Sequence, residues 1–393
     1  MVTACPESPA GCHISWLLSL IQLNLAVVVT AWMVKGTMQN EGVATALLGL
    51  CLACPDHSAS STVAGVQPAR PTAACPSSSG PCLPLTRVAD VDLPGNPVRF
   101  DYQDFDLAKR HLVIAHMNDA SVVIVNLDGS VVKVIPGIPT ARGVVVADEV
   151  GRIFVTSSPD RLVIIDNDSL QEVGRVQTGR APDGVGWDPV HRVVAVSDQG
   201  DGAVSLIADA GTGARTQVPL GSETGNVVFD PGRAIFWITV VARSPLNELV
   251  SVDPTTHAVT QRIPLPGCSG AHGLRIVPDG TSAFVACEDN DRLLRVSLDD
   301  AHAIAIGTTG AGPDVMSIDP DLGWIYVAAE SGDLTVFDIT RAGVNRVGRD
   351  HPGNDAHSVA VDPVSHHVFF PLVTGPNGTP VLRIMVPSGL SRD

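Results

Sequence analysis

Residues 313–338 read PDVMSIDPDLGWIYVAAESGDLTVFD, and this stretch decides the fold. Short runs rich in β-branched and aromatic residues alternate with turns, which predicts strands at Val315–Ile318, Trp324–Ala328, Leu334–Phe337 and, just beyond, Val344–Val347. The first turn is Asp319-Pro320-Asp321, where proline fixes φ and aspartate can bond its own backbone. A four-stranded unit of this kind is apolar on both faces, so it can be buried only between further copies of itself.

Six more copies of this unit occupy the chain from about residue 86 onward. The first strands of all seven copies open at residues 101, 142, 183, 225, 272, 314 and 357, so the spacing is 41 to 47 residues, which is typical of propeller blades. The seventh copy ends after its third strand, whereas RVADVDLPG at residues 87–95 has the pattern of a fourth strand. The sequence therefore predicts an all-β, seven-bladed β-propeller over residues 86–393, closed by an N-terminal strand that completes the last blade.

The chain of 393 residues is acidic, with a formal net charge of −16. Binding to nucleic-acid phosphates relies on Lys and Arg, and the chain has only two Tyr and five Trp that could stack on bases. We therefore expect no nucleic-acid partner. The expected partner is a small molecule or a protein, and the propeller itself is expected to be a monomer.

Residues 1–55 differ from the repeats. Residues 14–34 are uncharged, apolar and about long enough to span a bilayer, and residues 42–53 have the length of a signal-peptide core. The second of these segments runs into LGLCLAC at residues 48–54, which loosely resembles a lipobox with Cys54 as the lipidated residue. We interpret residues 1–55 as an export signal or membrane anchor, which predicts a periplasmic, membrane-anchored or secreted protein, and a lipoprotein if Cys54 is modified. A translation start at Met33 or Met38 is the alternative.

Residues 56–85 are rich in Ser, Ala and Pro and show no periodicity, which indicates a flexible tether. Membrane contact is expected only through the segment that precedes it. Cys75 and Cys82 flank a short Ser/Gly loop in this tether and could pair. Cys268 and Cys287 precede the first strand and end the second strand of one repeat, so antiparallel geometry places them at the same sheet edge. A disulfide is reachable there in an oxidising compartment; two unpaired cysteines are the alternative.

Several local patterns recur in the repeats. They are Leu93-Pro94-Gly95, Arg99-Phe100-Asp101-Tyr102, the segment GNVVFDP at 225–231, and Asp-Pro turns at 188, 230, 319 and 362. In these patterns residues 86–393 resemble the YncE-like family of exported bacterial β-propellers, which is related to the YVTN-repeat proteins. The resemblance implies the fold and export. It implies no particular activity, because members of the family mostly lack an assigned activity and a fold does not define a function.

The residues that open the first strands are expected to form a ring at one mouth of the central channel, since the first strand of every blade lines the channel. This predicted ligand-binding ring consists of Asp101, Arg142, Asp183, Asn226 (beside Gly225), His272, Asp314 and His357. Asp101, His272, Asp314 and His357 come from four consecutive blades. Imidazole and carboxylate groups suit zinc or another divalent metal, so these four are the candidate metal ligands. A hydrated channel mouth without a ligand is the alternative.

Two functions are compatible with this ring. The first is an exported binding or scaffold propeller that holds a ligand or partner at the channel face, because the sequence has no G-x-S-x-G elbow and no phosphate-binding glycine loop. The alternative is a metal-dependent hydrolase or lyase, similar to a lactonase, in which the metal activates water and a His or Asp acts as base. The ring contains no Glu, which counts against a calcium lactonase. The sequence identifies no catalytic residue, and whether the protein is an enzyme stays open.

Overall fold

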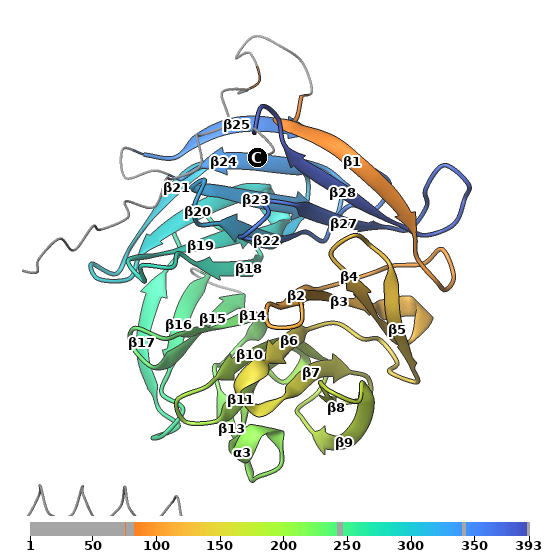
Figure 1. Ribbon diagram of the computed structural model, residues 1–393. Helices are drawn as coiled ribbons and strands as arrows, with labels where there is room; N and C mark the ends of the chain where they lie inside the picture. The colour runs from red at the N-terminus through yellow and green to blue at the C-terminus, as the bar shows by residue number, and fades with distance from the viewer. Residues whose placement is uncertain (1–74, 76–81, 242–246, 340–342, 391–393) are drawn as a thin grey trace, which may run out of the picture. The chain divides into compact units, whose positions relative to one another are not determined.

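Seven four-stranded antiparallel sheets surround a common centre in the computed structural model (Figure 1). The structure describes Cys75 and residues 82–241, 247–339 and 343–390, all within one unit, Val66–Asp393. Residues 1–55, which carry the predicted export segments, lie outside the described residues. In the part of the chain that is described, no helix is long and apolar enough to cross a membrane.

The first four sheets follow the chain, each strand pairing with the next. They are β2 (Gln103–Asp106), β3 (His111–His116), β4 (Ser121–Asn126) and β5 (Val131–Pro136); β6 (Val144–Ala147), β7 (Arg152–Ser157), β8 (Arg161–Asp166) and β9 (Gln171–Gln177); β10 (Pro182–Asp188), β11 (Val193–Asp198), β12 (Ala203–Ile207) and β13 (Arg215–Pro219); and β14 (Glu223–Asp230), β15 (Ile235–Val241), β16 (Glu248–Val252) and β17 (Val259–Pro264).

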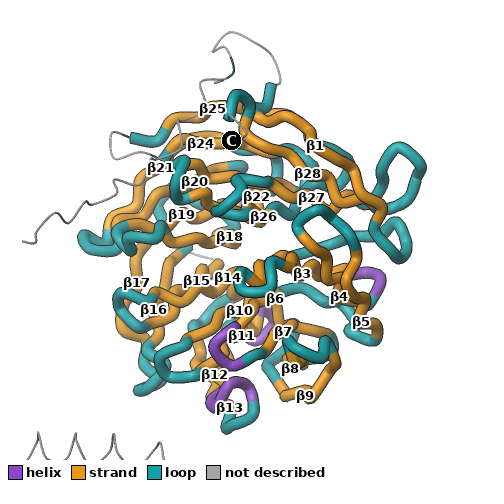
Figure 2. The backbone as a smooth tube through the Cα atoms, viewed as in Figure 1, coloured by secondary structure: helices purple, strands orange, loops and turns teal. Residues whose placement is uncertain are grey.

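The remaining sheets continue this order and close the ring. They are β18 (Ala271–Ile276), β19 (Ser282–Cys287), β20 (Arg292–Ser297) and β21 (His302–Thr308); β22 (Pro313–Asp319), β23 (Trp324–Ala329), β24 (Leu334–Asp338) and β25 (Asn345–Asp350); and β26 (Ala360–Val361), β27 (Val368–Leu372), β28 (Val381–Pro387) and β1 (Leu85–Asp92). Helical structure in the described residues is confined to short turns (Figure 2): η1 (Met117–Asp119), η2 (Asp148–Val150), η3 (Gln199–Asp201), η4 (Glu288–Asn290) and α3 (Ala208–Gly211).

The predicted fold is confirmed, including its closure by the N-terminal strand. β1 pairs antiparallel with β28, with Leu85 opposite Pro387 and Asp92 opposite Val381. The last sheet therefore has the order β1-β28-β27-β26, in which the first strand of the propeller supplies the outer edge of the last blade. Each innermost strand contacts the next around the ring, and β2 contacts β26. The strand expected at residues 87–95 thus starts two residues earlier, at Leu85, because it extends to the end of β28.

The aspartates at the predicted turns act as local hydrogen-bond acceptors. Oδ1 of Asp319 accepts the backbone N–H of Leu322 at 3.1 Å, and Oδ1 of Asp230 accepts those of Gly232 and Arg233 at 3.0 and 3.1 Å. These bonds satisfy backbone donors that the sharp turn leaves without a strand partner. They fix the loops at the end of the channel opposite the predicted ring.

The hydrophobic core lies between the blades. Each of the seven apolar clusters in the described chain combines side chains from two neighbouring sheets. One, for example, joins Trp324 of β23 to Phe370 of β27, and another joins Phe154 of β7 to Val194 of β11. Middle strands such as β23 are buried along their whole length, whereas the outer strand β9 is largely exposed. No blade can therefore be buried without both of its neighbours.

Both cysteine pairs considered above form disulfides. Cys268 and Cys287 lie 5.3 Å apart at their Cα atoms, and Cys75 and Cys82 lie 5.9 Å apart. Cys82 also forms an antiparallel bridge with Arg349 of β25, and the Cys75 N–H donates to the Val347 carbonyl at 3.3 Å. The disulfide-bonded end of the predicted tether is thus attached to the outer edge of one blade.

Candidate functional site

The seven predicted ring residues lie where the innermost strands begin. Asp183, Asn226, His272 and Asp314 belong to β10, β14, β18 and β22, and the other three immediately precede β2, β6 and β26. Five of them are buried, and the other two, Arg142 and His272, are partly exposed. We call this set, Asp101, Arg142, Asp183, Asn226, His272, Asp314 and His357, the channel mouth.

His272 connects the channel mouth across three blades. Its Nε2 bonds Oδ2 of Asp183 at 2.9 Å, and its Nδ1 bonds Oε2 of Glu288 at 3.2 Å. The same Nδ1 lies 3.9 Å from Oδ1 of Asp314. Asp183 lies in β10 and His272 in β18, and the blade that contains β14 stands between them. The imidazole of His272 therefore passes over that blade to reach Asp183.

A glycine makes this crossing possible. Gly225 opens the intervening blade, and a Cβ built on it would lie 2.7 Å from Cδ2 and 2.8 Å from Cα of His272. A side chain at residue 225 would occupy the space that the imidazole uses. Asn226, which we predicted in its place, is buried one residue deeper, with its Oδ1 beside Gly184. Gly225 thus opens this blade, and Asn226 lies one residue farther along the same strand.

Hydroxyl groups of second strands fix the backbone of the channel mouth. Thr156 of β7 donates to the carbonyl of Asp183 at 2.6 Å, and Thr239 of β15 donates to the carbonyl of His272 at 2.7 Å. Each bond joins one blade to the next, and both threonines are buried. The orientation of Asp183 and His272 is thus set by the neighbouring blade as well as by their own strand.

Two polar atoms of the channel mouth lack a partner. Oδ1 of Asp101 and Nε2 of His357 are buried and have no hydrogen-bond partner in the described structure. The other ring nitrogen of His357 is held by Asp355, with its carbonyl at 3.3 Å and Oδ1 at 3.2 Å. Buried polar atoms are normally bonded to protein or water, so this pair marks the place where a water or ligand group fits.

Charged side chains form a rim around these buried groups. Arg99 donates two hydrogen bonds to Glu330, at 2.6 and 2.7 Å, and both side chains are about one-third exposed, at 28% and 32%. Arg142 donates to Gln199 at 3.1 Å and lies 3.6 Å from Asp183. This agrees with a salt bridge at the mouth rather than an unpaired guanidinium.

Burial and crowding of like charges perturb the acids of the channel mouth. Burial, reinforced by the charge of Asp314, raises the pKa of Asp101 to about 7, against the opposing charge of His357. Burial also raises the pKa of Asp183, although His272 and Arg142 lower it. The mouth therefore contains one carboxyl group, that of Asp101, that can exchange protons near neutral pH.

Both histidines at the channel mouth favour the protonated form. Burial alone would lower the pKa of His272, but Asp314, Asp183 and Glu288 outweigh it and raise the pKa. Burial opposes the charge on His357 as well, and the hydrogen bond to Asp355 raises its pKa above the ordinary value. Both rings therefore bind a proton more readily than a free imidazole does, and the ring of His272 lies between the carboxyl groups of Asp183 and Glu288.

The candidate metal ligands do not converge in the structure. Across the described ranges, no group of three or more His, Cys, Asp and Glu side chains is arranged to hold a metal ion. Both nitrogens of His272 face carboxylates, and one nitrogen of His357 faces Asp355. A metal at Asp101, His272, Asp314 and His357 would need these side chains to rearrange, and it stays a prediction.

Three residues of the site were absent from the predicted ring. Tyr102, which precedes β2, donates its hydroxyl to Oδ1 of Asp314 in β22 at 3.2 Å, and Arg99 and Glu330 form the rim. Arg99 and Tyr102 flank Asp101 in the sequence, which was a usable signal. Glu330 follows a second strand, and its partner lies 231 residues away, so no local pattern indicated the pairing.

Comparisons with known proteins show the fold alone. No protein-family model matches the chain, and a search of curated proteins finds no match. A hydrazine synthase structure from Kuenenia stuttgartiensis is similar with a TM-score of 0.65 and 14% identity, covering 77% of this chain and 98% of the other. A streptogramin B lyase structure is similar with a TM-score of 0.61 and 12% identity, covering 75% and 96%.

The raised pKa of Asp101 predicts a pH-dependent loss of stability. The folded-state pKa, about 7, exceeds the ordinary aspartate pKa of 3.8, so the stabilising effect of the protonated form is complete below pH 4 and is lost as pH rises through 7. Asp101→Asn removes this titration. Relative to that variant, the wild type should lose on the order of 2–4 kcal/mol of unfolding free energy between pH 4 and 8. Urea denaturation at several pH values measures the difference, and parallel curves for the two proteins would contradict the assignment.

Proposed function

We propose that this protein is an exported β-propeller that binds a polar, hydroxyl-bearing small molecule at the channel mouth. The observation that carries the proposal is the unpartnered pair, Asp101 Oδ1 and His357 Nε2. Asp101 and His357 precede the innermost strands β2 and β26, which contact each other, and the charge of His357 acts on Asp101. A hydroxyl group can accept from the imidazolium and donate to the carboxylate. One ligand hydroxyl would therefore satisfy both.

The rim is consistent with a site that opens to admit a ligand. The charges of Arg99 and Glu330 act on His357, and that of Arg99 acts on Asp101. Their ion pair is partly exposed, and such pairs contribute little net stability. Separating them costs less than disturbing the buried residues beneath. The ligand would then exchange a solvated ion pair for hydrogen bonds in a desolvated site.

Export and membership of the YncE-like group belong to the same proposal. Their support is the apolar N-terminal segments, the repeat patterns at 93–102 and 225–231, and the two disulfides, which are typical of oxidising compartments. The propeller neighbours are compatible with this group but have only 14% and 12% identity. A protein partner at the same face is an outcome that the binding test distinguishes, since small probes would then fail to bind.

Binding of simple polyols tests the proposal. Calorimetric titration with myo-inositol and glucose, with acetate as an anionic comparison, should show saturable binding of a polyol. Asp101→Asn should weaken it at least about tenfold, since a hydrogen bond to a charged group contributes about 1.5–3 kcal/mol. Asp128→Asn, on an exposed turn, is the matched control and should bind normally. Absence of polyol binding, or equal affinity in Asp101→Asn, would contradict the proposal.

A hydrolase or lyase that uses the same mouth is the second candidate. It is favoured by His272, which has 15% of its side chain exposed and is oriented by Asp183 and Glu288, an arrangement suited to general acid–base catalysis. A structural neighbour is itself called a lyase. If a divalent metal binds, it would supply Lewis-acid activation of water or a carbonyl.

Turnover and metal content separate the two candidates. If the chain is an enzyme, it should hydrolyse or open a simple lactone, and His272→Ala should abolish that activity while the protein still melts cooperatively. Elemental analysis of protein purified without chelator, beside the His272→Ala/His357→Ala double variant, tests the metal. If the protein binds a polyol but turns over no lactone, the result supports the binding propeller and contradicts the enzyme.

A further inference from the structure

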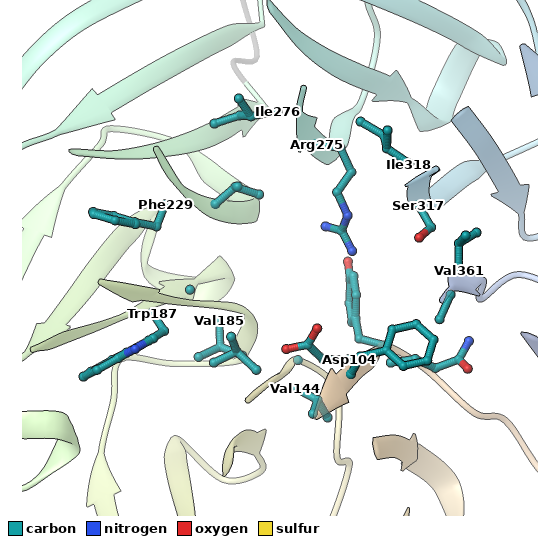
Figure 3. A pocket seen from close by; sticks show the side chains of 18 of the residues that line it. Asp104, Val144, Val185, Trp187, Phe229, Arg275, Ile276, Ser317, Ile318 and Val361 are labelled. Carbon is teal, nitrogen blue, oxygen red and sulfur yellow. The ribbon is translucent and has the colours of Figure 1, made fainter. Parts of the chain in front are cut away.

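A cavity lies in the channel beyond the channel mouth. It has a volume of about 480 Å³ and is lined by residues of all seven innermost strands or their adjoining loops (Figure 3). None of the seven channel-mouth residues lines it. Tyr102 separates the two spaces, because its side chain lines the cavity while its hydroxyl bonds Asp314 at the mouth.

The wall of this cavity is mainly apolar. Figure 3 shows Val144, Val185, Trp187, Phe229 and Val361 around the open space. Small residues, including Gly186 and Ala360, also line the space and occupy little of it. A space of this size, with aromatic and branched aliphatic walls and few polar groups, is typical of a small-molecule site.

Arg275 is the one Lys, Arg or His among the residues lining the cavity, and its guanidinium points into the space (Figure 3). In the described structure its side chain donates one hydrogen bond, from Nη1 to the carbonyl of Leu274 at 3.0 Å, and no carboxylate lies within ion-pair distance. Arg99, Arg233 and Arg383, by contrast, each bond a carboxylate. A guanidinium has five N–H donors, so Arg275 has donors available for a ligand.

Other polar residues also line the cavity, among them Gln103, Asp104 and Ser317, and Figure 3 shows Asp104 and Ser317 beside the open space. Asp104 Oδ2 accepts the backbone N–H of Val146 at 2.7 Å rather than pairing with Arg275. Burial raises the pKa of Asp104 to about 6, although the Val146 bond and Arg275 lower it. With one cation and a nearby carboxyl group, the site suits a single negative charge; a phosphate dianion would need a second cation.

We propose that this cavity binds a small monocarboxylate with an aromatic or branched aliphatic body, its carboxylate bonded to Arg275. Guanidinium and carboxylate groups match in a bidentate, charge-assisted geometry. The ligand neutralises a cation that the surrounding apolar wall desolvates, and its body covers the valine and aromatic side chains. The site is separate from the polyol site proposed above and does not depend on it.

Equilibrium dialysis of the full-length protein with 2-naphthoate and the neutral 2-naphthalenemethanol tests the site. Wild type should bind naphthoate more tightly than the alcohol. Arg275→Gln should weaken naphthoate binding ten- to a hundredfold, the range expected for a charge-assisted hydrogen bond. The alcohol should keep its affinity, which shows that the variant cavity is intact. His272→Ala should bind naphthoate as wild type does.

The response to pH gives a second, independent readout. The charged groups acting on Asp104 are Arg275 across the cavity and Asp148 of η2. Ionised Asp104 repels a bound carboxylate and competes for Arg275, so naphthoate affinity should fall several-fold between pH 5 and 8. In the Asp104→Asn variant, naphthoate affinity should stay the same between pH 5 and 8. Equal affinity for acid and alcohol, or loss of naphthoate binding in His272→Ala but not in Arg275→Gln, would overturn the proposal.

Discussion

The apolar surface shared between neighbouring blades is the constraint on which this structure depends. Each interface around the ring has its own cluster of buried side chains, and no sheet is buried by its own residues alone. Such an arrangement is stable only when the ring closes, and closure rests on the pairing of β1 with β28. The first strand of the propeller is thereby stabilised by its last strand, and each blade has a neighbouring blade on both sides.

Closure of the ring also creates the candidate site. Closure brings the beginnings of the innermost strands together, so polar residues there are buried next to one another. Glycines supply the space: a Cβ on Gly273 would lie 1.9 Å from the carbonyl oxygen of Asp314, and one on Gly225 would overlap His272. Farther along the channel small residues leave a cavity. One fold thus yields a crowded acidic mouth and an apolar chamber with a single guanidinium, divided by Tyr102.

Most of the fold could be predicted from the sequence, because strand and turn patterns repeat with the blades. Strands at Trp324–Ala329 and Leu334–Asp338 differ from expectation by one residue each. The members of the mouth followed from the same alignment. Their partners did not, since the bonds from His272 to Asp183 and from Arg99 to Glu330 join residues 89 and 231 positions apart. The role of Gly225, which lacks a side chain, was visible only once His272 was seen to pass over it.

The titration of His272 tests the central claim that the convergent blades hold its imidazolium among carboxylates. It can be followed by NMR of the ring protons in wild type and in Gly225→Ala, with Gly174→Ala as control, because a Cβ on Gly174 would meet only Ile164 Cδ1 at 3.9 Å. The account predicts a pKa above 6.5 in wild type and in Gly174→Ala, and a lower one in Gly225→Ala, where the methyl group separates the ring from Asp183. A wild-type pKa at or below 6.5, or one that Gly225→Ala leaves unchanged, would contradict it.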